Sequence, residues 1–226
     1  IADHPRIADH LTTRVTPNKI TMIPYGADEI AFADSRILDL YGLLPEQYSV
    51  IIARPEPENS IFEMVAAFSR CRRNHTLVVL GGLQPGENRF HRRLMDAASS
   101  EVLFLGAIYD QEIVKTLRFH ARFYLHGHQV GGTNPSLVEA MGAGCAVIAH
   151  DNEFNRWVVG GGAVYFADED GCAALFDLVL EDSDRLRSLK DESLRRFRER
   201  FNWDRVLREY EDLLNEWSQN GQRRRL

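Results

Sequence analysis

Short apolar runs rich in β-branched residues recur along the chain, and most are followed by a stretch whose apolar positions have helical spacing. The runs in the middle of the chain show no polar alternation, which is typical of strands buried on both faces of a sheet. On this pattern we predict strands over residues 19–26, 48–54, 76–82, 101–108, 122–128, 145–150 and 162–167.

Strands that alternate with helices imply right-handed crossovers and therefore a parallel sheet. From residue 170 onward only helical spacing remains. The sequence thus predicts a doubly wound, Rossmann-like α/β fold over residues 20–182 and C-terminal helices over residues 183–226. The opening "IADHPRIADHL" does not begin with Met, and we interpret residues 1–19 as the end of a preceding domain or a linker.

Composition narrows the function classes. The chain has 226 residues, 44% of them hydrophobic, so it can bury a full core. Its formal net charge of −6 argues against a nucleic-acid-binding protein. No apolar run approaches the roughly 18 residues of a membrane span, and no secretory signal opens the chain. The three cysteines show no metal-ligand spacing, so we expect reduced thiols and a cytoplasmic location.

Ligands of parallel α/β sheets bind beyond the carboxyl ends of the strands. The segments to consider are therefore residues 54–60, 81–85, 106–109 and 126–134, which are rich in glycine or polar groups.

The stretch "HGHQVGGTNPSLVEAMGAG" has the properties of an anion site at the start of a helix. Asn134 is a good N-cap, and a proline at the next position fits the first helical turn. Gly131 and Gly132 allow a ligand close to the backbone, and free N–H groups there would favour an anion. Glu139, one turn inside the helix, suits ribose hydroxyls. The alternative is a tight turn with a solvated Glu139.

Arg54 ends one predicted strand, where a guanidinium can contact two phosphate oxygens at once. Its alternative role is an ion pair with Glu56 or Glu58. His126 and His128 lie two apart, so in a strand they face the same side. A metal site there lacks a third ligand nearby in the sequence; His128 is instead a candidate contact for sugar or phosphate.

Several motifs resemble the nucleotide-sugar-binding C-terminal domain of GT-B-fold, group-one glycosyltransferases (glycosyltransferase family 4). They are "IPYGAD", "ARPEPENSI", "LGAI", "NPSLVEAMGAGCAVIA" and "FNWDRVLREYEDLL", and together they extend over nearly the whole chain from residue 20. "RPEPENS" and "HGHQVGGTNPSLVEAMG" look most like a bacterial, rhamnosyltransferase-like branch that makes surface polysaccharides.

The resemblance implies roles for matching positions. It places Arg54 on the donor diphosphate, Glu139 on the ribose, and the turn at Gly106 and Ile108, with Gly82 nearby, around the base. It places the backbone of Gly131, Gly132, Thr133 and Asn134 near the diphosphate and sugar. Two positions depart from the family: its phosphate-binding lysine falls on Asn59, and its first glutamate falls on Gly131.

The resulting hypothesis is the donor-binding half of a retaining, metal-independent glycosyltransferase with no cofactor beyond its nucleotide-sugar substrate. A glycan or lipid-linked acceptor would be bound by a domain that precedes this chain, and the whole enzyme would associate peripherally with the inner face of the membrane. No catalytic base is assigned. The alternatives are a GT-B sugar-nucleotide epimerase and a nucleotide-binding module without catalysis.

Overall fold

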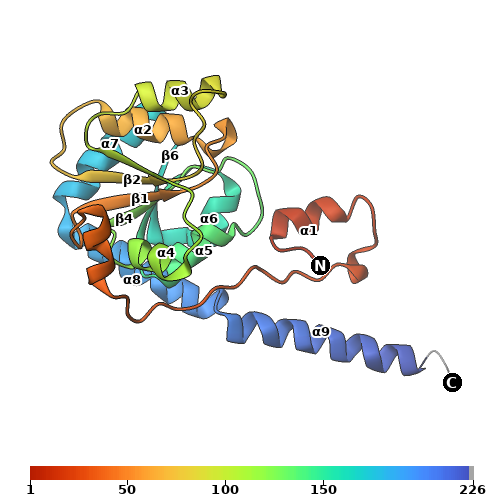
Figure 1. Ribbon diagram of the computed structural model, residues 1–226. Helices are drawn as coiled ribbons and strands as arrows, with labels where there is room; N and C mark the ends of the chain where they lie inside the picture. The colour runs from red at the N-terminus through yellow and green to blue at the C-terminus, as the bar shows by residue number, and fades with distance from the viewer. Residues whose placement is uncertain (224–226) are drawn as a thin grey trace.

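The computed structural model describes residues 1–223. Its centre is a single six-stranded parallel sheet (Figure 1). The spatial order of the strands is β3-β2-β1-β4-β5-β6. The strand bounds are β1 Tyr48–Ile52, β2 Thr76–Leu80, β3 Val102–Gly106, β4 Phe123–His126, β5 Ala146–His150 and β6 Ala163–Phe166.

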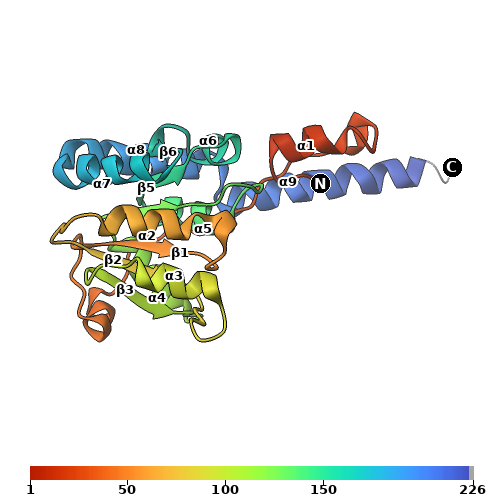
Figure 2. The ribbon, with the colours of Figure 1, turned by 90° about the horizontal axis from the view of Figure 1, so that it is seen from above.

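Helices cover both faces of this sheet (Figure 1), and Figure 2 looks down on the face that carries α2. One face carries α2 (Ile61–Ser69), α3 (Arg89–Asp96) and α7 (Glu169–Glu181). The other carries α4 (Gln111–Phe119), α5 (Pro135–Gly142), α6 (Glu153–Val159) and α8 (Ser183–Arg200), together with the 3₁₀ segment η2 (Ser35–Tyr41). The fold is therefore the predicted doubly wound, Rossmann-like α/β class with C-terminal helices.

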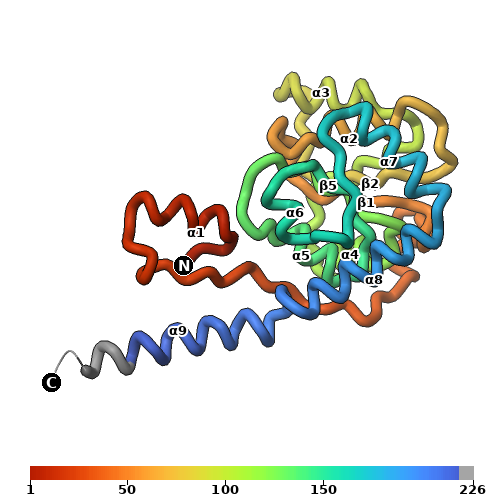
Figure 3. The backbone as a smooth tube through the Cα atoms, turned by 180° about the vertical axis from the view of Figure 1, so that it is seen from behind, coloured from red at the N-terminus to blue at the C-terminus, as the bar shows by residue number. Residues whose placement is uncertain are grey.

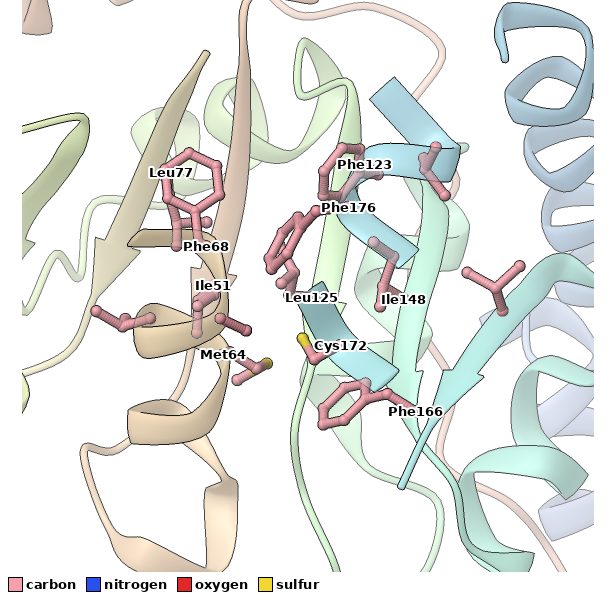
Figure 4. Close-up of a cluster of buried hydrophobic side chains, with 14 of the residues drawn as sticks. Ile51, Met64, Phe68, Leu77, Phe123, Leu125, Ile148, Phe166, Cys172 and Phe176 are labelled. Carbon is pink, nitrogen blue, oxygen red and sulfur yellow. The ribbon is translucent and has the colours of Figure 1, made fainter. Parts of the chain in front are cut away.

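Alternate residues of a strand point to opposite faces of the sheet, and apolar clusters cover both faces. Ile51, Leu125 and Ile148 join the cluster under α2 and α7 (Figure 4). Their neighbours Val50 and Tyr124 belong to the cluster under α4 and α5. Burial on both sides is the physical reason that the sequence shows continuous apolar runs here.

The two ends of the described chain project together from the α/β body, as Figure 3 shows. They comprise α1 (Pro5–Leu11) and α9 (Trp203–Arg223). Ile23, from the segment after α1, is buried against Val206 and Leu213 of α9. Leu207, Leu214 and Trp217 of α9 are exposed.

The strand predicted over residues 19–26 is wrong. Met22 forms only an isolated bridge with Ala2, and Ala27 forms one with Asn202. The segment runs away from the sheet toward the start of α9, so it finds no strand to pair with. Apolar residues in this segment pack against α9 instead. An apolar run in the sequence does not distinguish a strand in the sheet from an extended segment packed on a helix.

The other predicted strands are confirmed, each within a few residues of the predicted ends. The domain boundaries after residues 19 and 182 stay a prediction, and α8 packs closely on β5 and α5. Residues 224–226 of the predicted C-terminal segment lie outside the described residues. Within residues 1–223 no helix is long and apolar enough to cross a membrane.

The strand order reverses between β1 and β4, which pair in parallel through Val50 with Tyr124 and Ile51 with Leu125. The chain leaves these two strands toward opposite halves of the sheet, which opens a crevice beyond their carboxyl ends. Arg54 follows β1 and His128 follows β4, so both lie at this crevice.

A buried histidine at the opposite end of the sheet makes stability depend on pH. His75 is 8% exposed, and its Nε2 lies 2.8 Å from Ser49 Oγ. Burial lowers the pKa of His75 from 6.5 to about 4. The unfolded chain therefore binds a proton that the folded chain does not, and stability is lost as pH falls from 6.5 toward 4.

We predict that His75 contributes a loss of about 1.4 kcal/mol in the free energy of unfolding for each pH unit within that range. Urea denaturation at pH 7, 6 and 5 measures it. His75→Gln should show a shallower pH dependence than the wild type, because it removes the titrating group. Parallel pH profiles for the two proteins would contradict the assignment.

Candidate functional site

An open groove of about 440 Å³ lies at the carboxyl edge of β1, β2, β3 and β4. Six of the residues predicted from the sequence line it: Arg54, Gly82, Ile108, His128, Asn134 and Glu139. The structure therefore gathers side chains from four separate strand ends in one site. Asn59, Gly106, Gly131, Gly132 and Thr133 do not line the groove.

The loops that follow β1 and β4 are joined to each other beside the groove. The amide N–H of Gln129 donates to the Glu58 carbonyl at 3.0 Å, and its side-chain amide donates to Ser60 Oγ at 3.0 Å. Gly127 lies so close to the Asn59 carbonyl oxygen that a Cβ would come within 2.1 Å of it. Glycine is required here by space alone.

Asn59 supports the loop that carries Arg54. Its side chain is 4% exposed, and its amide donates to the Arg54 carbonyl at 2.9 Å. This hydrogen bond turns Asn59 inward, so the structure does not bring it into the groove with the other predicted donor contacts. At the position where the resemblance leads us to expect a lysine, Asn59 instead stabilises the backbone at Arg54.

The Arg54 side chain is exposed. Among residues 1–223 no carboxylate lies within ion-pair distance of its guanidinium, so the alternative pairing with Glu56 or Glu58 is not seen. The charge of Arg54 also helps to lower the pKa of the neighbouring His128. The groove therefore presents one unneutralised cation at its rim.

His126 and His128 stack as their spacing predicts, with ring centroids 4.4 Å apart and planes 9° from parallel. Burial, and then the Arg54 charge, lowers the pKa of His128 to about 4. Burial also lowers the pKa of His126, and neither of its ring nitrogens has a hydrogen-bond partner within the described chain. No metal-binding group of three His, Cys, Asp or Glu residues occurs there or elsewhere in residues 1–223.

The start of α5 differs from the predicted anion site. Asn134 caps the helix as expected, since its side chain accepts from the Ser136 amide at 3.1 Å. The next two amides, of Leu137 and Val138, both donate to the Asn134 carbonyl at 3.1 Å. The amides of Ser136, Leu137 and Val138 are therefore occupied, so free donors for the predicted anion site would come from the loop before the helix.

The loop before α5 contacts the N-terminal segment. The Thr133 amide donates to the Asp3 carboxylate at 3.0 Å, and the Thr133 hydroxyl donates to the Asp3 carbonyl. A Cβ on Gly132 would come within 2.3 Å of that same carboxylate. Gly132 and Thr133 thus face Asp3 here, whereas Gly131 is exposed with a positive φ of 155°. A carboxylate already occupies part of the loop that was assigned to the diphosphate.

The turn after β3 forms the far side of the groove. Gly106 adopts a positive φ of 71°, which glycine tolerates without strain. Its carbonyl accepts a hydrogen bond from the Gly81 amide at 2.9 Å, which ties the ends of β2 and β3 together. Ala107 and Ile108 then line the groove beside Gly82.

Sequence reasoning missed Arg118, which pairs with Glu139. Arg118 Nη2 lies 2.5 Å from Glu139 Oε2 and donates to Ser136 Oγ at 3.1 Å. The Arg118 side chain is 7% exposed and that of Glu139 is 38% exposed. In the sequence, Arg118 looks like an ordinary basic residue in the last turn of a helix, so nothing indicated this partner.

The fold and the groove together define an α/β protein with a ligand site at the switch point of its sheet. Comparison with known proteins is consistent with this class. Residues 44–199 match the family described as glycosyl transferases group 1. The chain therefore belongs to the group 1 glycosyltransferase family.

A phosphatidyl-myo-inositol mannosyltransferase from Mycolicibacterium smegmatis is 31% identical over 172 residues, which is 74% of this chain and 44% of that protein. Sucrose-phosphate synthase from Thermosynechococcus elongatus superposes with a TM-score of 0.80 at 18% identity, over 97% of this chain and 58% of that one. HepE from Anabaena, in complex with UDP and glucose, gives 0.79 at 16% identity, over 96% and 62%. The chain spans less than two thirds of each relative.

The close approach at Gly127 is testable. Gly127→Ala should reduce the free energy of unfolding by roughly 1–3 kcal/mol, because the new methyl group forces the two loops apart. Urea denaturation measures this. Gly86→Ala is the matched control, since a Cβ there meets nothing within 4 Å. Equal stability of the two variants would show that the loops yield easily.

Proposed function

We propose that this chain is the donor-binding half of a glycosyltransferase that moves a sugar from a nucleotide-diphosphate sugar to an acceptor hydroxyl. The observation that carries the proposal is the groove itself, in a group 1 glycosyltransferase fold. It holds the Arg54 guanidinium, which has no ion-pair partner in residues 1–223, and the partly exposed Glu139 carboxylate. The cation suits a diphosphate and the carboxylate suits hydroxyl groups. Within this proposal the groove accepts the nucleotide.

The support for a diphosphate comes chiefly from Arg54. As the bond between sugar and diphosphate breaks, negative charge grows on the leaving group, and a fixed cation stabilises it. The neutral His128 at the groove provides a ring N–H that can donate to a phosphate or sugar oxygen. The amides of Gly131, Gly132 and Asn134 make no hydrogen bond within residues 1–223, so they are further donors.

The support for a nucleoside comes from the opposite side of the groove. Ile108 and the glycine-containing ends of β2 and β3 provide an apolar wall and accessible backbone for a base. Glu139 lines the same groove and can accept hydrogen bonds from the ribose hydroxyls. In the HepE complex the ligands are UDP and glucose, which is the same class of ligand.

The finer features of the proposal rest on the resemblance. They are retention of the anomeric configuration, independence of metal and cofactors, membership of family 4 and a rhamnosyltransferase-like role in surface polysaccharide synthesis. The acceptor, a glycan or lipid-linked glycan, would be bound by a part of the whole protein outside this chain, which we place in the cytoplasm at the inner face of the membrane. Because the first-turn amides of α5 are occupied, the proposal relies on Arg54 and on the amides of the preceding loop to bind the diphosphate.

Two alternatives use the same groove. A GT-B epimerase would bind the nucleotide sugar and alter the sugar without transfer. A non-catalytic module would bind the nucleotide alone, which the Gly131 and Asn59 departures permit. Neither alternative explains the exposed Arg54 and the anchored Glu139 better than a glycosyltransferase does.

We predict that nucleoside diphosphates raise the melting temperature of this chain and that Arg54→Ala weakens their binding about tenfold or more. Losing one charged hydrogen bond to phosphate costs roughly 1.5–3 kcal/mol. Calorimetric titration with UDP, GDP, ADP and dTDP measures the effect. Arg187→Ala, which removes an exposed arginine of α8, serves as the control. Equal affinities for the wild type and Arg54→Ala would remove Arg54 from the site.

Transfer itself requires an acceptor, so we predict that this chain alone binds the donor and transfers no sugar. A longer protein that adds the acceptor-binding part should release nucleoside diphosphate from a nucleotide sugar only when a glycan or lipid-linked acceptor is present. Analysis of the recovered nucleotide sugar detects epimerisation. An altered sugar in the absence of an acceptor would favour the epimerase. Robust transfer by this chain alone would refute the proposal that the acceptor is bound outside it.

A further inference from the structure

Arg118 is a buried guanidinium whose contacts converge on the carboxylate of Glu139. It ends α4 facing the start of α5, where it reaches both Glu139 and Ser136. Ser136 is held in turn, because its hydroxyl lies 2.7 Å from the Tyr124 hydroxyl and donates to the Ile52 carbonyl at 3.3 Å. The network thus ties the arginine to the ends of β1 and β4.

Burial of this arginine is unfavourable unless its charge is compensated. Arg118 Nε is buried and has no hydrogen-bond partner within residues 1–223. An apolar side chain would fill the same space without that deficit. The guanidinium, unlike an apolar side chain, holds the Glu139 carboxylate in a fixed position.

Glu139 forms part of the wall between two cavities. The groove of about 440 Å³ includes both Arg118 and Glu139 in its lining, and so does a neighbouring cavity of about 370 Å³. Arg118 Nη2 lies 2.5 Å from Oε2, and Oε1 makes no hydrogen bond within the described chain. One carboxylate oxygen is therefore anchored and the other is free to accept hydrogen bonds.

We propose that Arg118 is a positioning residue that holds the Glu139 carboxylate ready for the ribose hydroxyls of the nucleotide. The inference rests on the proposed function, since it requires a nucleotide in the groove. An unanchored glutamate samples several rotamers and must be ordered when the ligand binds. Anchoring removes that requirement, so Arg118 strengthens ribose recognition without contacting the ligand.

The test compares ligands with and without ribose hydroxyls. UDP and 2′,3′-dideoxy-UDP are titrated into the wild type, Arg118→Met, Glu139→Gln and the double variant. If GDP, ADP or dTDP binds more tightly than UDP, that nucleotide and its analogue without ribose hydroxyls replace the UDP pair. Arg122→Met is the matched control, because Arg122 is half-buried and bonds to Leu180 and Ser183 away from the groove.

We expect the wild type to prefer the hydroxylated ligand by about tenfold, as for a hydrogen bond to a charged acceptor. Arg118→Met and Glu139→Gln should both reduce the preference to about threefold or less, and the double variant should show no further loss. Arg122→Met should keep the full preference. A merely structural arginine would change stability, or affinity for both ligands equally, and would leave the ratio unchanged.

An unchanged ratio in folded Arg118→Met would overturn the inference while the proposed function stands. If Arg118→Met does not fold, Arg118→Lys replaces it. Lysine keeps the charge and loses the forked geometry, so a reduced ratio supports positioning and an unchanged ratio overturns it. Failure of the wild type to bind any of the nucleoside diphosphates would instead refute the proposed function.

Discussion

The parallel pairing of β1 with β4 is the constraint on which the site depends. These strands lie side by side although more than seventy residues separate them, and the sheet reverses its order between them. Their carboxyl ends bring Arg54 and His128 to one crevice. The two loops that follow can meet there only because Gly127 has no side chain to contact the Asn59 carbonyl.

Charge in the groove is distributed unevenly, and this shapes what it can bind. Glu139 and Arg118 neutralise one another, so the groove's remaining cation is Arg54, with a neutral His128 beside it. An anion is therefore attracted to Arg54, and hydroxyl groups can donate to Glu139. The proposed ligand, a nucleotide-diphosphate sugar, carries both kinds of group.

The contact between Asp3 and the loop before α5 links the N-terminal segment to the candidate site. Asp3 occupies the Thr133 amide and lies against Gly132. The adjoining His4 is buried against Phe154 and Trp157, and Arg6 pairs with Glu153 at 2.6 Å. Residues that precede the α/β body thus contribute to the conformation of the loop beside the groove.

The sequence by itself determined the α/β class, because apolar runs without alternation, separated by helical spacing, are compatible with little else. It also indicated Arg54, His128, Asn134 and Glu139, since residues just after buried parallel strands must share one edge of the sheet. It could not distinguish a strand over residues 19–26 from a segment that packs on α9, because both bury the same apolar side chains.

Only the tertiary structure decided which groups pair with which. Arg118 reaches Glu139 from a different helix, Asn59 turns inward to the Arg54 carbonyl, and Asp3 crosses to Thr133 from the other end of the chain. Each is a contact between polar groups far apart along the chain or hidden within a loop. Such contacts depend on angstrom-scale distances set by packing, and no periodicity or local spacing in the sequence encodes them.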